Sequence, residues 1–151
     1  MRSHIAEYQD NFSNVIAGRS KRDTLFNERL AVDINSILDT LSKNGSSSTF
    51  NISNAKYHIT RAENVTFQYL LKPDYQLVER FRSELNQAKT QLSQTSASSQ
   101  AFSSVITKLD KIDGEFLQLT NVTSGYLFLV NVVMAGSANE FLFMARELNR
   151  L

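Results

Sequence analysis

Apolar residues recur along this chain in steps of three and four, which is the period of an amphipathic helix. The pattern predicts four helices, at about residues 5–43, 52–72, 75–94 and 100–150. The first and the last are much longer than the two between them. The sequence is therefore expected to fold as an all-α protein.

Three short segments break the pattern. Gly45 suits a left-handed helix end, and a run of serine and threonine follows it at residues 46–49. Pro73 ends the second helix, because the residue before a proline avoids the helical region. The third break is the small, polar segment 95–99. The chain has one proline and five glycines, so few other helix breakers are present.

Helix lengths constrain the architecture. At about 1.5 Å per residue, the first helix measures roughly 60 Å, the middle two about 30 Å each and the last about 75 Å. Short connections favour antiparallel neighbours. We therefore expect an antiparallel up-down-up-down four-helix bundle whose middle helices cover only one half of the long ones. In the other half only two helices remain, with Asn121 level with Arg22 and Asn131 level with Phe12.

The last helix has a long uncharged stretch. Between Phe116 and Asn139 there is no Asp, Glu, Lys, Arg or His. A helix that is apolar on most sides needs cover on most sides, which one neighbouring helix cannot supply. A second copy can supply it, so the sequence predicts a homodimer through the first and last helices. The alternative, a membrane span over 116–139, has sufficient length but is opposed by its many polar and small residues.

Composition narrows the function. The 151 residues suffice for one domain, taken as 1–151, and the net charge of +1 with dispersed Lys and Arg does not indicate a nucleic-acid partner. The absence of cysteine excludes thiol catalysis, thiolate metal sites and disulfides. Both ends cut through helical patterns, so we expect this chain to be part of a longer protein.

Residue patterns for catalysis are missing. No phosphate-loop, dinucleotide-binding, nucleophile-elbow or zinc-protease motif occurs, and His4 and His58 have no partners at metal-ligand spacing. Asp110 and Asp113 form a carboxylate pair flanked by lysines, a pattern more typical of a solvated face than of a metal site. We expect no enzyme activity, no bound metal and no cofactor.

Polar residues on the long helices suggest a ligand site instead. Arg22 and Arg29 are seven residues apart, which places both on one face of a regular α-helix. The last helix carries Asn121, Thr123 and Tyr126 at the levels opposite them. Arginine forks facing hydroxyls and amides suit a carboxylate, so these five residues are the predicted clamp for a small organic anion or amino acid.

Other assignments remain open at this stage. Arg22 has the alternative of a surface ion pair with Asp23 or Glu28. Arg61 on the second helix is a further ligand-binding candidate. The remaining positions of interest are the weaker candidates His58 and Arg80 and the expected core aromatics Tyr57, Phe67 and Tyr69.

Three stretches together are similar to a known family. They are Tyr8-Gln9-Asp10-Asn11-Phe12 leading to Lys21-Arg22-Asp23-Thr24-Leu25, Arg61-Ala62-Glu63-Asn64-Val65 leading to Val78-Glu79-Arg80-Phe81, and Val130-Asn131-Val132-Val133-Met134-Ala135-Gly136-Ser137-Ala138-Asn139-Glu140-Phe141. The chain resembles the four-helix-bundle periplasmic ligand-binding domains of methyl-accepting chemotaxis receptors and related sensor histidine kinases.

The resemblance implies a dimeric sensor domain in the periplasm, flanked by two membrane spans of an inner-membrane protein. Ligand binding would then shift the last helix slightly. In the aspartate receptor of this family, arginines on the first helix of both subunits hold the ligand, and Arg22 and Arg29 lie at comparable levels here. Three alternatives stay open: a histidine-kinase sensor, a sensor that reads a periplasmic binding protein, and a structural helical-bundle adaptor.

Overall fold

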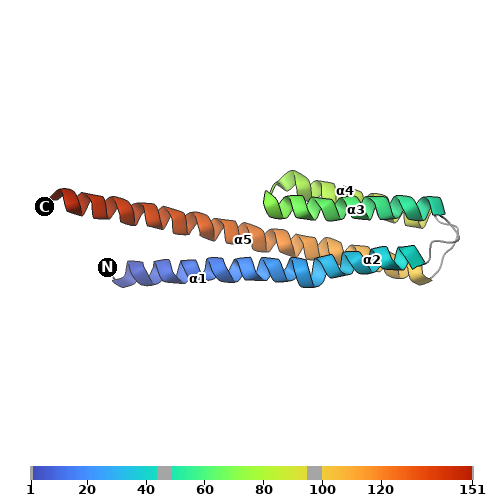
Figure 1. Ribbon diagram of the computed structural model, residues 1–151, viewed down its shortest axis with the longest axis horizontal. Coiled ribbons are helices and arrows are strands. Elements are labelled where there is room, and N and C mark those ends of the chain that lie inside the picture. The colour runs from blue at the N-terminus through green and yellow to red at the C-terminus, as the bar shows by residue number, and fades with distance from the viewer. Residues whose placement is uncertain (1, 44–48, 95–99, 151) are drawn as a thin grey trace. The chain divides into compact units, whose positions relative to one another are not determined.

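The computed structural model describes residues 2–43, 49–94 and 100–150, and nearly all of them are helical (Figure 1). No strand occurs within these ranges, so the expected all-α class is confirmed. The helices begin and end within three residues of the predicted positions, while the predicted breaks at Gly45 and 95–99 lie outside the described residues. The elements are α1 (Arg2–Thr24), the π-helical turn η1 (Leu25–Leu30), α2 (Ala31–Lys43), α3 (Thr49–Leu71), α4 (Tyr75–Ser93) and α5 (Gln100–Arg150).

The chain divides into two compact units. The first, here called the two-helix unit, consists of residues 1–23 and 121–151 and so contains α1 and the C-terminal part of α5. The second, here called the core unit, consists of residues 24–120. It contains η1, α2, α3, α4 and the N-terminal part of α5.

Aromatic rings join three helices of the core unit. Phe116 of α5 stacks on Phe81 of α4 with ring centroids 4.1 Å apart, and its edge meets Tyr69 of α3 at 5.4 Å. All three side chains are buried, and the two phenylalanines are at most 1% exposed. Burial follows alternating steps of three and four, the spacing of helix seams that pack together. On α3 and α5 these buried positions are Ile52, Ala55, Ile59, Ala62, Thr66, Tyr69, Phe102, Val105, Leu109, Ile112, Phe116 and Leu119.

Neighbouring helices of the core unit run antiparallel. The chain reverses direction between α3 and α4 (Figure 1). At this turn Pro73 precedes Asp74, whose carboxylate caps α4 by accepting from the Gln76 backbone N–H at 3.0 Å. Between α2 and α5, Lys108 Nζ lies 3.2 Å from the Ser36 hydroxyl, and Lys111 Nζ lies 3.1 Å from Asp33. Three residues forward on α5 thus match three residues backward on α2.

The turn η1 departs from a regular α-helix. Leu25 and Leu30 are both buried although they are five residues apart. In an α-helix two such positions point to different faces, whereas the wider π-helical winding, with hydrogen bonds from i to i+5, brings them closer to one face. The apolar pattern predicted an unbroken α-helix here, so this change of winding was not expected.

Two glycines lie at the contact between α1 and α5 in the two-helix unit. A Cβ atom at Gly18 would lie 3.5 Å from the Cβ of Tyr126, and one at Gly136 would lie 3.8 Å from the Tyr8 ring. Ten residues back along α1 match ten residues on along α5, so the pair is antiparallel. This agrees to within one residue with the predicted levels of Phe12 and Asn131.

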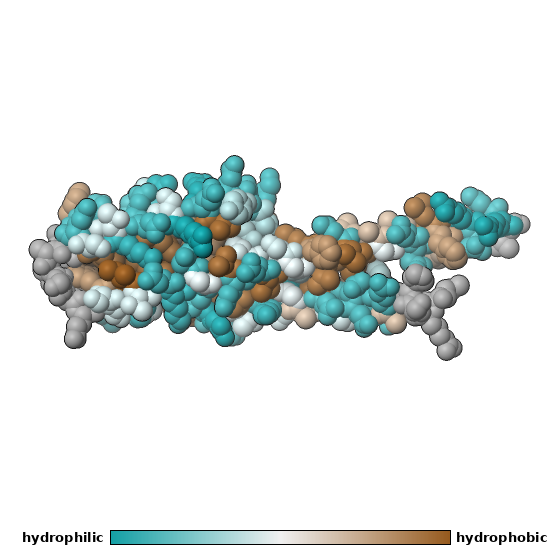
Figure 2. All heavy atoms as spheres, turned by 180° about the vertical axis from the view of Figure 1, so that it is seen from behind, coloured by the Kyte–Doolittle hydropathy of each residue, from teal (hydrophilic) through white to brown (hydrophobic). Residues whose placement is uncertain are grey.

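The two-helix unit has almost no core of its own. Among its described side chains only Thr123 is buried. Apolar surface is visible on this unit, at the right of Figure 2. Its exposed large apolar residues include Tyr8, Phe12, Ile16, Leu127, Phe128, Met134, Phe141, Leu142, Phe143, Met144 and Leu148.

One described helix is long and apolar enough to cross a membrane, judged by length and composition alone. It is α5, in which the most apolar 18-residue window has a mean hydropathy of 1.6 and none of its residues is buried. A buried core helix does not explain this segment, so its apolar side chains remain to be covered.

The ring cluster of the core unit gives a first prediction. We expect Phe116→Ala to lower the free energy of unfolding by about 3–5 kcal/mol, because it removes a buried ring between two other rings and leaves a cavity. The matched control is Phe50→Ala on α3, where the ring is 77% exposed and the expected change is within about 0.5 kcal/mol. Urea unfolding followed by circular dichroism measures both, and equal losses in the two variants would contradict the assigned core.

Candidate functional site

The structure brings together two of the predicted site residues in the two-helix unit. The Arg22 guanidinium lies over the Tyr126 ring, 5.4 Å from its centroid. Its Nη2 also donates to Asp23 Oδ1 at 3.1 Å, so the surface ion pair considered as the alternative is present as well. Only 16% of the Arg22 side chain is exposed. Arg22 is thus a partly desolvated cation whose charge is shared by a carboxylate and a ring face.

Asn121 and Thr123 belong to the same unit but differ in access. Asn121 is exposed, whereas Thr123 is fully buried and takes part in a further interaction. The Asn121 side chain is therefore accessible to solvent, while the Thr123 side chain is enclosed by its neighbours.

Arg29 lies in the π-helical turn η1, in the core unit, and its side chain is exposed. The expectation that Arg22 and Arg29 share a face used a winding of 3.6 residues per turn, which does not hold inside a π-helical turn. Arg22 belongs to the two-helix unit, and the shared face of the two arginines stays a prediction.

Arg61 lies in a polar cluster of the core unit. Its Nε lies 2.9 Å from Glu84, its Nη1 donates to the Tyr57 hydroxyl at 2.9 Å, and Glu84 also contacts His58 Nδ1 at 2.7 Å. The hydrogen bond to Tyr57 and the Glu84 charge raise the pKa of Arg61. Because Glu84 is buried, the Arg61 guanidinium compensates its desolvation, and the contacts of Glu84 with Arg61 and His58 join α3 to α4.

Three aromatic residues were expected in the core, and one of them is there. Tyr69 is buried, but Tyr57 is 54% exposed and Phe67 is 47% exposed. Tyr57 lies beside Arg61, and the Phe67 ring meets Phe26 edge-on at 5.5 Å. Both rings are therefore partly exposed to solvent rather than enclosed in the apolar seam.

Asp110 and Asp113 form ion pairs with another helix. Asp110 pairs with Lys89, and Asp113 pairs with Arg82 at 3.3 Å. In the described part of the chain no group of three or more His, Cys, Asp or Glu side chains is placed to hold a metal ion. The two carboxylates therefore serve to connect α5 to α4.

A buried carboxyl group lies close to this region. Glu115 is 7% exposed, and burial together with the neighbouring Asp33 carboxylate raises its pKa to about 7. Burial alone would raise the pKa of Asp33, but hydrogen bonds with Glu115 and Lys111 lower it. Lys111 lies 3.1 Å from Asp33 and 3.7 Å from Glu115. Near neutral pH this group of three therefore carries a proton that Glu115 readily gains or loses.

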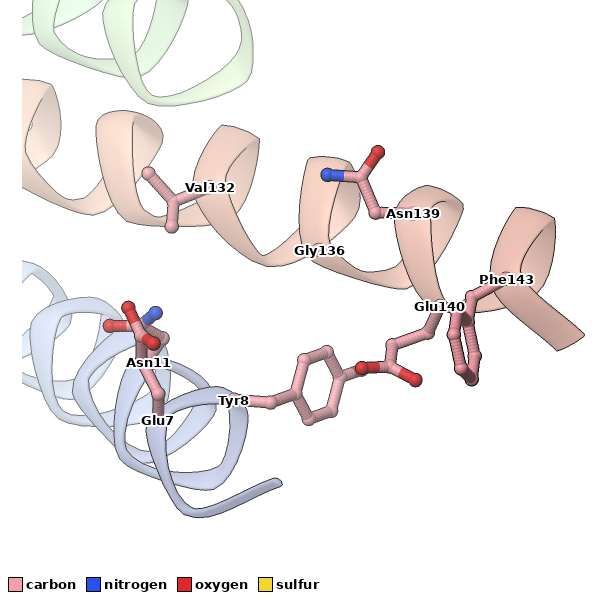
Figure 3. A pocket seen from close by; sticks show the side chains of 8 residues that line it. All are labelled: Glu7, Tyr8, Asn11, Val132, Gly136, Asn139, Glu140 and Phe143. Carbon is pink, nitrogen blue, oxygen red and sulfur yellow. The ribbon is translucent and has the colours of Figure 1, made fainter. Parts of the chain in front are cut away.

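An open cavity lies between α1 and α5 within the two-helix unit (Figure 3). It has a volume of about 600 Å³. The Tyr8 ring extends from α1 towards Glu140 and Phe143 of α5, and Ser137 Oγ donates to the Tyr8 hydroxyl at 3.1 Å. The lining residues are Glu7, Tyr8, Asn11, Val132, Gly136, Asn139, Glu140 and Phe143. None of them was a predicted site residue. The predicted register of α1 against α5 would have placed only Tyr8 and Gly136 opposite each other.

Comparison with known proteins adds no assignment. No protein-family model, no curated protein sequence and no solved structure matches this chain. The function is therefore argued from the chain's own residues.

The raised pKa of Glu115 gives a second prediction. Its folded-state pKa of about 7 exceeds the ordinary value of 4.5, so the stabilisation is complete below pH of about 4.5 and is lost as pH rises through 7. Asp33 stays ionised throughout this window because its pKa is lowered. We expect the free energy of unfolding to fall by about 1–3 kcal/mol between pH 5 and pH 8 on account of this group.

The variant Glu115→Gln imitates the protonated form and tests the assignment. It should be about as stable as the parent protein at pH 5 and more stable at pH 8. Glu79→Gln removes one exposed carboxylate of α4 and should leave the pH dependence unchanged. Thermal unfolding at several pH values provides the measurement, and an unaltered pH slope in Glu115→Gln would assign the effect to another group.

Proposed function

We propose that this chain is the ligand-binding sensor domain of a bacterial transmembrane chemoreceptor. In this proposal it is an antiparallel up-down-up-down four-helix bundle that acts as a homodimer in the periplasm, between two membrane spans of the intact protein. It detects a small carboxylate-bearing molecule and signals through a shift of α5. The observation that carries the proposal is the lack of a core in the two-helix unit.

The exposed apolar residues of α1 and α5 are better matched by a second copy than by lipid. Two copies of a two-helix unit supply four helices, enough to enclose an apolar seam. The uncharged stretch also contains Gln118, Asn121, Asn131 and Asn139, whose amides form hydrogen bonds readily at a protein interface and are costly in hydrocarbon.

Arg22 supplies the expected recognition of a carboxylate. It is partly desolvated, it lies over Tyr126, and the exposed Asn121 belongs to the same unit. An incoming carboxylate would compete with Asp23 for the guanidinium, which holds two parallel donors. A signal requires that the ligand bind the two arrangements of α5 with different affinity.

Three alternatives differ from this proposal in the signal that the domain sends or in what it recognises. A histidine-kinase sensor would use the same dimer and the same helix shift. A sensor that reads a periplasmic binding protein would present a docking surface and bind no small anion. A structural adaptor would show neither ligand binding nor flanking membrane spans in the parent gene.

The dimer gives a third prediction. We expect sedimentation equilibrium to give twice the chain mass of 17.1 kDa. Phe128→Glu places a charge on the exposed apolar face of α5, where the ring is 67% exposed, and should shift the equilibrium to monomer. Phe50→Glu makes the same chemical change in the core unit and should leave the dimer intact. If the parent protein is monomeric and floats together with lipid vesicles, a membrane rather than a second copy covers this apolar face.

Ligand binding gives a fourth prediction. A thermal-shift screen with succinate, L-aspartate, other organic acids and inorganic anions should raise the unfolding midpoint, since a ligand that binds only the folded state stabilises it by about 2.7 kcal/mol at a hundredfold excess over its dissociation constant. Arg22→Ala should abolish the shift, and Arg19→Ala, an exposed arginine three residues earlier, should retain it. No shift with any anion would favour sensing through a partner protein.

A further inference from the structure

Tyr8 forms one wall of the cavity in the two-helix unit. Tyr8 lies against the bare backbone of Gly136, where a Cβ would already be 3.8 Å from the ring, and its hydroxyl accepts a hydrogen bond from Ser137. These two contacts fix the ring across the space between α1 and α5. The volume of about 600 Å³ lies within the range of small-molecule sites.

The charge of the cavity is negative. Glu7 on α1 and Glu140 on α5 both line it, and no Lys, Arg or His is among the described residues that line it. In the part of the chain that the structure describes, neither carboxylate forms an ion pair. Figure 3 shows Glu7 beside Asn11 at one end of the cavity and Glu140 beside Tyr8 and Phe143 at the other, and a cation bound at the Glu140 end would be stabilised by that carboxylate.

The remaining lining favours an organic cation over a metal ion. The Tyr8 and Phe143 rings offer two π faces, which attract ammonium groups, and Val132 offers an apolar contact for a carbon frame. The side-chain oxygens of Asn11 and Asn139 accept hydrogen bonds from N–H donors. A bare metal ion would need oxygen ligands at short, fixed distances and would gain nothing from the rings.

We propose that this cavity binds an organic ammonium ion that carries an apolar or aromatic group. Glu140 neutralises the ammonium, and the neighbouring rings of Tyr8 and Phe143 pack on its apolar part (Figure 3). The site lies eleven residues or more from Arg22 along α1, and its preferred charge is opposite to that of a carboxylate ligand. It therefore requires neither the anion site nor the receptor role.

Isothermal titration calorimetry of the whole chain tests the proposal, with phenethylammonium as the probe and 2-phenylethanol as its uncharged analogue. Phenethylammonium should bind and 2-phenylethanol should not. Glu140→Gln should weaken binding about tenfold or more, which is the loss expected for a charge-assisted contact. Asp10→Asn removes the same charge from an exposed position of α1 outside the cavity and should change the affinity less than about twofold.

Several results would overturn the ammonium site. Equal binding of the uncharged analogue would make the cavity an apolar groove. If Asp10→Asn and Glu140→Gln weaken binding equally, only the net charge of the protein matters for binding. The absence of heat with phenethylammonium, in a parent protein whose helical circular dichroism is intact, would exclude the site directly. Arg22→Ala should bind phenethylammonium normally, so loss of the anion site and loss of the ammonium site are distinguished in one series of variants.

Discussion

Two helices packed side by side can each cover only one stripe of the other, and this limit governs the two-helix unit. A stripe of that width suits a helix whose opposite face is polar. The C-terminal part of α5 is apolar on several faces, and Leu127, Phe128 and Met134 remain exposed after α1 has packed against it. The proposed cover by a second copy rests on this geometry rather than on any single contact.

Charged side chains are partnered differently in the two units. In the core unit, charged side chains pair across helices: Glu84 with Arg61, and Asp33 with Lys111. In the two-helix unit, Arg22 is shared between Asp23 and a ring, and no cation lines the cavity beside Glu7 and Glu140 among the described residues. Groups whose charge is already compensated hold helices together, whereas the uncompensated carboxylates are the ones available to a ligand.

Much of the fold could be predicted from the sequence, because the apolar period and the break at Pro73 are local signals. The register of α1 against α5 also followed, since rise per residue is constant in both helices. Side-chain direction did not follow. The π-helical turn that contains Arg29 was missed because no residue pattern announces it. The cavity was missed because Glu7 and Glu140 look like ordinary surface residues until α1 and α5 are packed side by side.

Continuity of α5 explains how a segment with so few buried contacts stays helical. Nucleation is the costly step of helix formation, and each further residue adds one backbone hydrogen bond for one residue fixed. The buried positions from Phe102 to Leu119 hold the first part of α5 in the core unit, so the residues after Asn121 extend a helix that already exists. Such a segment is stable as a helix but weakly fixed in position. This is the state in which cover by a partner or occupation of a cavity changes the packing most, because segments with few buried contacts lie at the low-stability end of a structure.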